Sequence, residues 1–486
     1  MKFNIIFYGI GTVLKYLGIL FLLPIVCAVC FKENHAIAPY LVTSLVSSAL
    51  GFLMTTKKVE EKEINSTNKK EALTLVFFIW LLFGVLCTIP YFFYDFSVPN
   101  ALFEAVSGIT TTGATIISDF SLYPKSLFFY RSLTQWLGGM GIIVLFIAIL
   151  PQFAVAGRNM FYGEMTGPVE DKITPRIRYS ASWLWGLYVL FTFIEVLLLK
   201  FVCGINLYDS ICTAFSTLSS GGFSPQAQSI AAYGDWKVTF IVLVFMFIAG
   251  ANFLLQYKIF IKRKPEAFLK SEEFKVYLGL ILILSLAIFL ILIIKTHMDA
   301  PNALLHSFFQ TVSIITTTGF ASCDYSSWNI DAKIILFLLM FTGACAGSTS
   351  GGFKIIRWIF VYKYLKNEIS KIIHPQAIYP IKIEGKTIGE DTKGQLVAFV
   401  IFYFAIFGIS TFLVALIEHN TTVALTGSIA MLGNVGPAFG PLHPFGNYAE
   451  LSVATKFIFI FNMLIGRLEL IPFLALLHPD LWHKRG

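Results

Sequence analysis

Charged side chains are scarce in this sequence. Asp, Glu, Lys and Arg make up 13% of its 486 residues, whereas a soluble globular protein carries about 25%. Hydrophobic residues make up 56%, and the mean hydropathy is +0.75. Residues 276 to 294, VYLGLILILSLAIFLILII, form an uncharged run long enough to cross a bilayer as one helix. The composition excludes an ordinary soluble domain and predicts a polytopic membrane protein.

The cysteines form no pattern that indicates a disulfide framework or a metal site. There are seven, an odd number, and they are widely spaced and lie mostly in apolar runs. Such residues usually behave as small buried hydrophobes. They are Cys27, Cys30, Cys87, Cys203, Cys212, Cys323 and Cys345.

The sequence also lacks the motifs of an enzyme. None of the eight histidines is paired at the spacing of a zinc-protease motif. Of two glycine-rich stretches, GGMGI (138–142) lies inside a predicted span, and GSTSGG (347–352) lacks the Lys of a phosphate-binding loop. The longest predicted cytoplasmic loop, 361–393, is too short for a nucleotide-binding domain. We therefore expect no enzyme and no cofactor in this chain, and any nucleotide control must come from a partner.

The net charge of +8 is distributed as in a membrane protein rather than in a nucleic-acid-binding protein. The basic residues cluster in alternate loops, and the intervening loops hold few. This is the positive-inside pattern, and it predicts that both termini are cytoplasmic. The clusters lie within 57–70, 158–178, 258–275 and 363–393 and at 484–485.

Apolar runs predict ten spanning helices, an even number that agrees with two termini on the same side of the membrane. Their boundaries are expected to hold to within a few residues. The predicted spans are 5–29, 38–55, 74–94, 131–150, 181–202, 237–259, 276–295, 333–360, 394–417 and 456–477.

Four turns rich in hydroxyl residues and glycine recur in the outer loops. SGITTTGAT (107–115) and SIITTTGF (313–320) are nearly the same, and two weaker copies contain SSGGF and NVGP. Each turn follows a short semi-apolar stretch, and the four glycines are 109, 97 and 117 residues apart. Self-similarity of this kind indicates a repeat fold. The glycines are Gly113, Gly222, Gly319 and Gly436.

These turns predict a cation pathway. Non-helical backbone is tolerated at membrane depth only where it lines a water-filled path or is buried in protein. A half-helix of about ten residues is about 15 Å long, and its negative C-terminal end favours a cation. Backbone carbonyls, turned inward with the help of glycine, can replace the hydration shell of an alkali ion. The alternative is that Thr-Gly runs are helix-packing patches. The predicted filter residues are Thr111, Thr112, Gly113, Ser220, Gly221, Gly222, Thr317, Thr318, Gly319, Asn434, Val435 and Gly436.

The predicted fold is an all-α polytopic membrane protein. Four tandem helix–pore-helix–filter–helix repeats surround a central pore, and two extra transmembrane helices precede them. The predicted units are an N-terminal two-helix domain with a cytoplasmic linker (1–72) and repeats at 73–178, 179–273, 274–392 and 393–486.

With these motifs the chain resembles the Trk/Ktr/HKT superfamily of potassium transporters over essentially its whole length. The two extra helices favour the TrkH type over the shorter Ktr type. The resemblance implies a potassium-selective pore in each subunit of a homodimer, with potassium as the permeant ligand. It also implies an inner-membrane location in a bacterium and a cytoplasmic, nucleotide-binding partner of the RCK type, similar to TrkA. The marks are TQWLGGMGI (134–142), STLSSGGFS (216–224), ACAGSTSGGFK (344–354), LGNVGP (432–437) and GRLELIP (466–472), besides the TTTG turns.

The resemblance also suggests two gating elements. GACAGSTSGGF (343–353) interrupts a predicted span, and it is expected to obstruct or open the path below the filter; the alternative is a packed kink. Arg467 lies within the last predicted span, where an arginine normally faces a cavity or a partner. By resemblance it projects into the pore as a barrier to cations; the alternative is an ion pair with a buried carboxylate. The predicted gating residues are Gly347, Ser348, Thr349, Ser350, Gly351, Gly352 and Arg467.

Two further transport mechanisms stay open at this stage. A proton- or sodium-coupled symporter usually shows inverted repeats and midplane acids, and neither is clear here. A channel that discriminates less between potassium and sodium is also compatible with the sequence, although a glycine at position 113 favours potassium by resemblance. Three loop acids, Glu104, Asp119 and Asp324, are expected to be solvated or to attract cations at the outer mouth.

Overall fold

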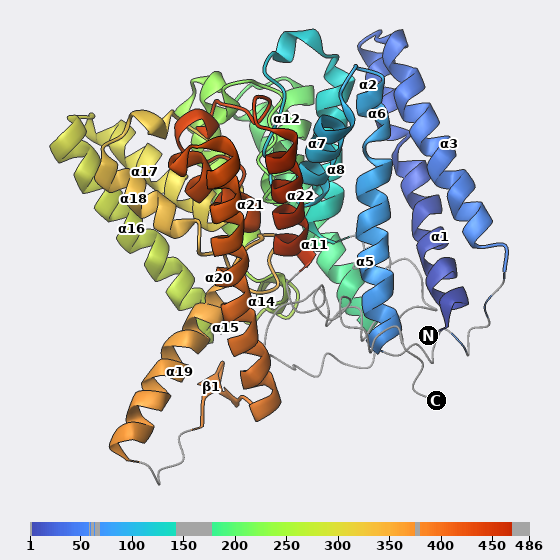
Figure 1. The fold of residues 1–486 in the computed structure, drawn as a ribbon. Coiled ribbons are helices and arrows are strands. Elements are labelled where there is room, and N and C mark those ends of the chain that lie inside the picture. Colours follow the sequence, from blue (N-terminus) through green and yellow to red (C-terminus); the bar gives the residue numbers. More distant parts are fainter. Residues whose placement is uncertain are drawn as a thin grey trace.

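The computed structural model describes residues 2–57, 59, 63, 69–141, 177–374 and 380–468. Over these residues the chain is helical except for its turns, its loops and one short antiparallel hairpin, β1 (Lys382–Ile383) and β2 (Lys386–Thr387). The helices stand side by side, and α19 (Ile355–Ile373) projects with the hairpin from one end of the body (Figure 1). The prediction of an all-α polytopic membrane protein is confirmed.

Two apolar segments at the N-terminus pack on each other through small residues. The first comprises α1 (Phe3–Leu20) and α2 (Leu23–Cys30), and the second is α3 (Ile37–Met54). A Cβ on Gly11 would lie 2.8 Å from the carbonyl oxygen of Gly51, and one on Gly51 would lie 2.7 Å from that of Gly11. The Ser47 hydroxyl donates to the Leu14 carbonyl at 2.8 Å. Close packing of this kind is typical of membrane helices.

Four units follow, each with a long helix, a short helix that ends in a turn, and a returning helix. The first has α5 (Lys69–Leu86), α7 (Val98–Ile109) and α8 (Lys125–Gly139); the second has α11 (Ile177–Phe201), α12 (Leu207–Leu218) and α13 (Trp236–Gly250). The third has α16 (Glu272–Thr296), α17 (Ala300–Ile315) and α18 (Ile330–Leu339). The fourth has α20 (Glu390–Glu418), a π-helical turn (Val423–Gly427) with α21 (Ser428–Leu432), and α22 (Val453–Leu468). Short helices α6 (Ile89–Phe92), α14 (Phe253–Phe260) and α15 (Glu266–Lys270) connect them, with 3₁₀ turns at Asn34–Ala36, Phe120–Leu122, Ser229–Tyr233, Tyr325–Ser327 and Gly440–Leu442.

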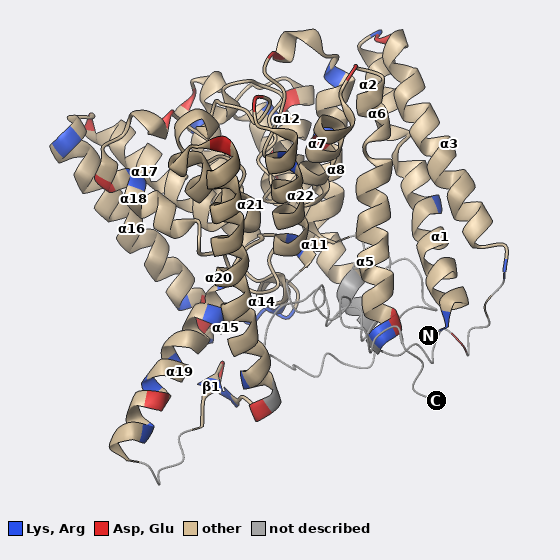
Figure 2. Ribbon diagram, in the orientation of Figure 1, with Lys and Arg blue, Asp and Glu red and all other residues tan. Residues whose placement is uncertain are grey.

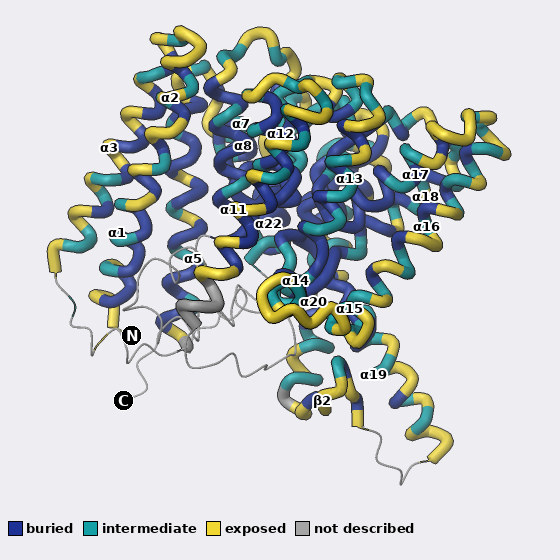
Figure 3. The backbone as a smooth tube through the Cα atoms, turned by 180° about the vertical axis from the view of Figure 1, so that it is seen from behind, coloured by how far each residue is buried: buried dark blue, intermediate teal, exposed yellow. Residues whose placement is uncertain are grey.

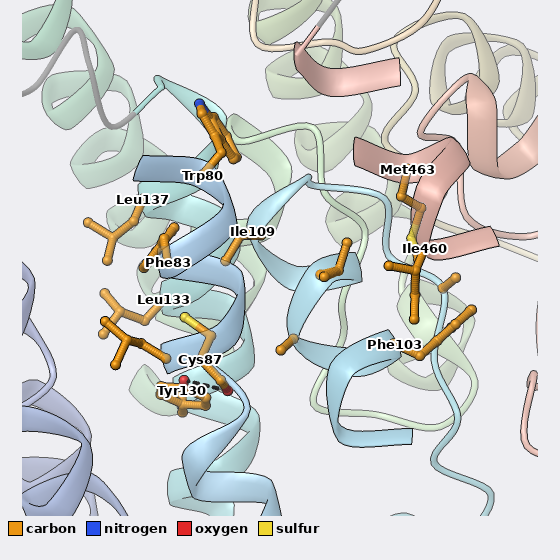
Figure 4. Packing of buried hydrophobic residues seen from close by; sticks show 14 of the residues in the cluster. Trp80, Phe83, Cys87, Phe103, Ile109, Tyr130, Leu133, Leu137, Ile460 and Met463 are labelled. Atoms are coloured by element: carbon orange, nitrogen blue, oxygen red, sulfur yellow. Dashed lines mark hydrogen bonds between the residues drawn. The ribbon is translucent and has the colours of Figure 1, made fainter. Parts of the chain in front are cut away.

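The first and fourth units pack together, so that the four units close around a centre. In Figure 4, Phe103 of α7 lies beside Ile460 of α22, while Ile109 lies on the side of α7 that faces α5 and α8. The Tyr130 hydroxyl of α8 donates to the Cys87 carbonyl at 3.0 Å. The short helices and α8 are largely buried, whereas many residues along the outer helices α3, α16 and α20 are exposed (Figure 3).

The apolar spans agree with most of the predicted ones. Among the described residues, six continuous or gently bent helical segments are long and apolar enough to cross a membrane, and charged residues lie mostly toward the ends of the body and along α19 (Figure 2). The six are Phe3–Cys30, Asn34–Met54, Lys70–Phe92, Ser182–Phe201, Glu272–Thr296 and Thr392–Glu418.

Two predicted spans are broken in the structure, and two others lie partly outside the described residues. The segment 237–259 bends by 100° between α13 and α14, where the Asn252 side chain caps α14 by accepting from the Leu254 amide at 2.8 Å. The segment 333–360 is not one helix either, because α18 ends at Leu339 and α19 begins at Ile355, as the small-residue interruption predicted. Parts of the spans 131–150 and 456–477 lie outside the described residues.

Candidate functional site

The four short helices end in the same hydrogen-bonded motif. In the first unit the Thr112 amide donates to the Ser107 carbonyl at 2.9 Å, and the Thr111 amide donates to that of Gly108 at 3.0 Å. This pair of bonds is the Schellman motif, whose penultimate position is left-handed and usually glycine. The bonds equivalent to that from Thr112 to Ser107 run from the amides of the other three turns to carbonyls five residues earlier. They are Gly221 to Ser216 (2.8 Å), Thr318 to Ser313 (2.9 Å) and Val435 to Ala430 (2.8 Å).

In all four motifs the left-handed position holds a side chain instead of glycine. The φ angles are 55° at Thr111, 56° at Ser220, 56° at Thr317 and 54° at Asn434. A non-glycine residue in this region is disfavoured by about 1–2 kcal/mol. Strain repeated at equivalent positions points to a functional demand on these side chains.

The predicted glycines follow two residues later and are also left-handed. Their φ angles are 79° at Gly113, 74° at Gly222, 77° at Gly319 and 95° at Gly436. Each has a geometric reason to lack a side chain, because its α-carbon lies against a carbonyl of another unit.

These close approaches connect the four turns into a ring. A Cβ on Gly113 would lie 2.2 Å from the carbonyl oxygen of Gly221. A Cβ on each of the other three glycines would also lie close to a carbonyl oxygen. The distances are 2.0 Å from Gly222 to Thr318, 2.1 Å from Gly319 to Val435 and 2.3 Å from Gly436 to Thr112. Each unit therefore presents one carbonyl to the glycine of the preceding unit, and the fourth unit closes the circle onto the first. We call Thr112, Gly221, Thr318 and Val435 the ring residues.

Three ring carbonyls accept no hydrogen bond from the part of the chain that the structure describes. Among the described residues no hydrogen bond is donated to the carbonyl oxygens of Thr112, Thr318 or Val435, although all three residues are fully buried. Nearly all buried carbonyls in folded proteins are paired, and leaving one unpaired costs about 1–3 kcal/mol. A set of such groups around one centre can bind a cation.

Four of the turn threonine hydroxyls pair with one another, whereas the Thr111 hydroxyl is buried and has no hydrogen-bond partner in the described part of the chain. Thr110 and Thr112 pair at 2.8 Å, and Thr316 and Thr318 also pair at 2.8 Å. The Asn434 amide nitrogen donates to the Thr112 hydroxyl at 2.9 Å, which joins the fourth turn to the first. The hydroxyls of the ring residues Thr112 and Thr318 are therefore engaged, and the candidate ligands that these residues offer are their backbone oxygens.

On one side of the ring lies a cavity of about 80 Å³. Its lining includes Gly113, Gly222 and Gly319 together with Pro437 and Tyr448. The three glycines and Pro437 belong to the glycine ends of the turns, so that the cavity leads to the ring from that side.

Of the three loop acids named from the sequence, Glu104 departs from the expectation and Asp119 agrees with it. Glu104 is not solvated, because it is fully buried and accepts from the Arg131 Nε at 2.7 Å. Asp119 is exposed, and hydrogen bonds from Ser121 hold the pKa of its carboxyl below the usual value. Asp324 is partly exposed and lies 3.7 Å from the Nδ1 of His443.

On the other side of the ring lies the Gly-rich segment, residues 343–353. The Thr349 hydroxyl pairs with the Ser220 hydroxyl at 2.8 Å, and the Gly351 amide donates to the Thr317 hydroxyl at 2.8 Å. A Cβ on Gly351 would lie 2.7 Å from the Cβ of Asn434. The left-handed side chains of three units therefore contact this segment.

The remaining predicted gating residues hold the segment in its folded path. The Gly347 carbonyl accepts from the Phe253 amide at 3.0 Å, and the Ser348 and Ser350 hydroxyls pair at 2.8 Å. Gly347 and Gly352 have positive φ angles of 70° and 68°. The two ends of the Gly-rich segment are joined by a hydrogen bond from the Gly343 amide to the Phe353 carbonyl at 2.8 Å.

Arg467, in the last turn of α22, joins this segment to the first unit. Its Nη1 donates to the Thr349 carbonyl at 2.7 Å, and its Nη2 donates to the Gly138 and Gly139 carbonyls at 2.6 and 2.7 Å. The C-terminal end of α8 carries partial negative charge, which favours a guanidinium there. The sequence suggested either a pore barrier or a carboxylate partner, and the structure adds backbone carbonyls as acceptors.

Three buried polar residues of this region were not singled out from the sequence. Gln135 of α8 contacts the turn of the second unit, and Glu273 of α16 accepts from the Ala346 amide of the Gly-rich segment at 2.7 Å. Glu195 of α11 is fully buried, and neither of its carboxylate oxygens has a hydrogen-bond partner in the described part of the chain. Glu195 had a sequence signal, an acid within a predicted span; Gln135 lies within the motif TQWLGGMGI but was given no role, and Glu273 had no signal.

Comparisons with known proteins agree with this architecture. The sequence matches the TrkH family, described as "Cation transport protein", over residues 34–298 and 294–483. It is 33% identical to the Trk system potassium uptake protein TrkH of Salmonella typhimurium, over 98% of this chain and 100% of that protein. It is 30% identical to the Trk system potassium uptake protein TrkG of Escherichia coli K12, over 95% of each.

A solved structure is also similar. The crystal structure of the potassium transporter TrkH from Vibrio parahaemolyticus superimposes with a TM-score of 0.89 at 29% identity, over 99% of this chain and 100% of that one. The likeness extends over the full length in sequence and in structure. It places the chain among multi-pass membrane transporters rather than enzymes, and the chain belongs to the TrkH family of cation transport proteins.

Proposed function

We propose that this protein mediates potassium uptake through a selective, gated pore. Its relatives carry the names of potassium uptake proteins. The observation that carries the proposal is the ring of four carbonyls, each packed against a glycine that admits no side chain. A potassium ion that enters such a ring exchanges its hydration shell for backbone oxygens.

The ring carbonyls act as potassium ligands in this proposal, and the short helices support them. The C-terminal ends of α7, α12, α17 and α21 converge on the four turns, so that their partial negative charges favour a cation there. The left-handed residues before the ring hold the backbone in the shape that brings one carbonyl per unit to the centre. The twelve predicted filter residues thus divide into strained supports, carbonyl ligands and close-packed glycines.

We propose that the Gly-rich segment is the gate. It contacts the side chains that support the ring, and Arg467 ties it to α8. Each of these hydrogen bonds contributes about 0.5–1.5 kcal/mol net. Together they hold the segment with a few kcal/mol, which is comparable to the 1–3 kcal/mol that a regulatory ligand typically transmits between sites. A partner protein could therefore displace the segment.

A second candidate is proton-coupled uptake, and Glu195 is the observation that favours it. Ionisable groups buried within spanning helices commonly mark proton paths. Glu195 lies in α11, next to the short helix α12 of the second unit. Sodium-coupled uptake and a pore that discriminates less between potassium and sodium remain further alternatives for the test below.

We extend the proposal to the assembly of the protein. By family resemblance it forms a homodimer in the lipid of the bacterial inner membrane, with both termini cytoplasmic, and it binds a TrkA-like RCK subunit. The four transport units would be 73–178, 179–273, 274–392 and 393–486, after an N-terminal domain at 1–72. Copurification of the full chain with such a subunit, followed by measurement of the mass of the complex, tests the assembly.

Flux measurements on purified protein in liposomes test the transport mechanism. Under a potassium gradient alone, a selective pore gives potassium flux that needs neither a sodium gradient nor a pH gradient. Flux that requires a pH gradient, and that Glu195→Gln abolishes, would instead favour proton coupling. Equal sodium and potassium flux would favour the less selective channel.

A further inference from the structure

The second turn departs from the pattern of the others at one position. The ring residue is a threonine in the first and third units and a valine in the fourth, but it is Gly221 in the second. Gly221 does not have a positive φ, so its backbone conformation does not require glycine. Something else must occupy the place of the missing side chain.

Gln135 of α8 occupies that place. A Cβ built on Gly221 would lie 2.4 Å from the Cδ of Gln135, 2.5 Å from its Oε1 and 2.8 Å from its Nε2. Gln135 is fully buried and comes from the first unit, 86 residues earlier in the chain. The glycine and the glutamine are therefore a complementary pair.

Gln135 also binds the backbone on both sides of Gly222. Its Nε2 donates to the Gly221 carbonyl at 2.6 Å, and its Oε1 accepts from the Phe223 amide at 3.0 Å. The carbonyl can only accept and the backbone amide can only donate, so the orientation of the side-chain amide is fixed by its partners. This two-point contact holds the Gly221 carbonyl in one direction.

This contact makes the ring asymmetric. Among the described residues, the Gly221 carbonyl is the one ring carbonyl that accepts a hydrogen bond from the protein. A carbonyl oxygen has two lone pairs, so one remains for a cation. The bond fixes the direction of this oxygen and draws on its negative charge, and both effects alter how well it suits one ion size over another.

We propose that Gln135 is a positioning residue that sets the cation specificity of the ring by orienting the Gly221 carbonyl. The proposal rests on the proposed function of the ring as a potassium filter. A residue of the first unit thus controls the carbonyl that the second unit contributes to the ring.

The test compares potassium and sodium permeability in proteoliposomes of the full chain. Gln135→Met keeps the length of the side chain and removes the amide. The expected result is a fall of about fivefold in the potassium-to-sodium permeability ratio, which corresponds to about 1 kcal/mol at 1.4 kcal/mol per tenfold. Gln310→Met is the matched control, because Gln310 is also fully buried beside a turn, but its Nε2 donates to the Ser322 hydroxyl at 3.3 Å and not to a ring carbonyl.

A double variant separates positioning from simple loss of packing. Gln135→Ala with Gly221→Thr gives the second turn the threonine of the first and third units. Ser219 holds the position in the second unit that Thr110 and Thr316 hold in the first and third. In those units the hydroxyl at this position pairs with the hydroxyl of the ring threonine at 2.8 Å. Gly221→Thr alone should disrupt the turn. The double variant should recover folding but keep the lowered permeability ratio of Gln135→Met, because its threonine fills the space without donating to the carbonyl of residue 221.

The outcomes separate this proposal from the one on which it rests. An unchanged permeability ratio in folded Gln135→Met, with a potassium-selective unsubstituted protein, overturns the role of Gln135 alone. An equal fall in the Gln310→Met control also overturns it, because the effect would then not depend on the ring carbonyl. If Gln135→Met does not fold, a double variant that folds with the permeability ratio of the unsubstituted protein overturns the proposal, because filling the space alone would then be enough. An unsubstituted protein without selective flux overturns both proposals.

Discussion

Substitution of Gly113 by serine tests the geometry of the ring. A Cβ at this position would lie 2.2 Å from the Gly221 carbonyl oxygen, whereas real Cβ contacts essentially never fall below 3.0 Å. The carbonyl or the turn must therefore move by at least 0.8 Å, the difference of the two values. Overpacking of this kind costs about 1–3 kcal/mol, and the φ of 79° adds about 1–2 kcal/mol for a residue with a side chain.

The displacement of the Gly221 carbonyl is what changes the selectivity. If only about 1.4 kcal/mol of this strain falls on the potassium-bound state relative to the sodium-bound state, the permeability ratio changes tenfold. We therefore expect Gly113→Ser to lower the potassium-to-sodium ratio by at least about tenfold. The assay is uptake of each ion into proteoliposomes under a matched gradient, normalised to the amount of folded protein.

Gly204 offers a matched control for backbone strain. It has a φ of 71°, close to that of Gly113, but a Cβ there would meet nothing within 4 Å. Gly204→Ser should reduce stability slightly and leave the permeability ratio unchanged. The reasoning is refuted if folded Gly113→Ser retains the ratio of the unsubstituted protein, or if Gly204→Ser changes it to the same extent.

Three further predictions concern the gate and the scaffold. Arg467→Ala removes three hydrogen bonds to backbone carbonyls and should raise potassium flux at equal expression; equal flux would count against a role in closure. Thr317→Val removes the acceptor of the Gly351 amide, which costs about 1–3 kcal/mol in a buried site, and should increase the open fraction in single-channel recordings; an unchanged open fraction would argue that the segment is not the gate. Glu104→Ala leaves Arg131 as a buried charge without its carboxylate and should destabilise the protein by about 3–5 kcal/mol; a melting temperature equal to that of the unsubstituted protein in detergent would contradict this.

The four turns could be predicted from the sequence because their chemistry is local. A glycine in a hydroxyl-rich turn and the short semi-apolar stretch before it are both visible within about 15 residues. The interruption at 343–353 was visible for the same reason. Local backbone demands restrict the residue types directly, so the pattern survives in a single sequence.

Contacts between distant segments could not be predicted in this way. Gln135 reads as one polar residue in an apolar helix, and its contact with Gly221 depends on how α8 packs against the second turn. Glu273 reads as an ordinary acid in the first turn of a helix, although it accepts from the Ala346 amide. The pairing of segments that are 73 to 86 residues apart follows from tertiary packing.

The bend between α13 and α14 was not predicted for a different reason. Asn252, which follows Gly250 and Ala251, is a typical helix-capping residue and could have marked the break. The apolar residues on both sides of it outweighed that signal. In a membrane protein, hydropathy alone does not distinguish a straight span from two helices at an angle.

The most direct test of the central claim is the position of a bound ion. Crystals of the full chain grown with rubidium in place of potassium should show an anomalous scattering peak at the centre of the ring, within coordination distance of the carbonyl oxygens of Thr112, Gly221, Thr318 and Val435. The peak should be lost in Gly113→Ser crystals. A well-ordered ring without a peak, or a peak that coordinates only other residues, would contradict the account.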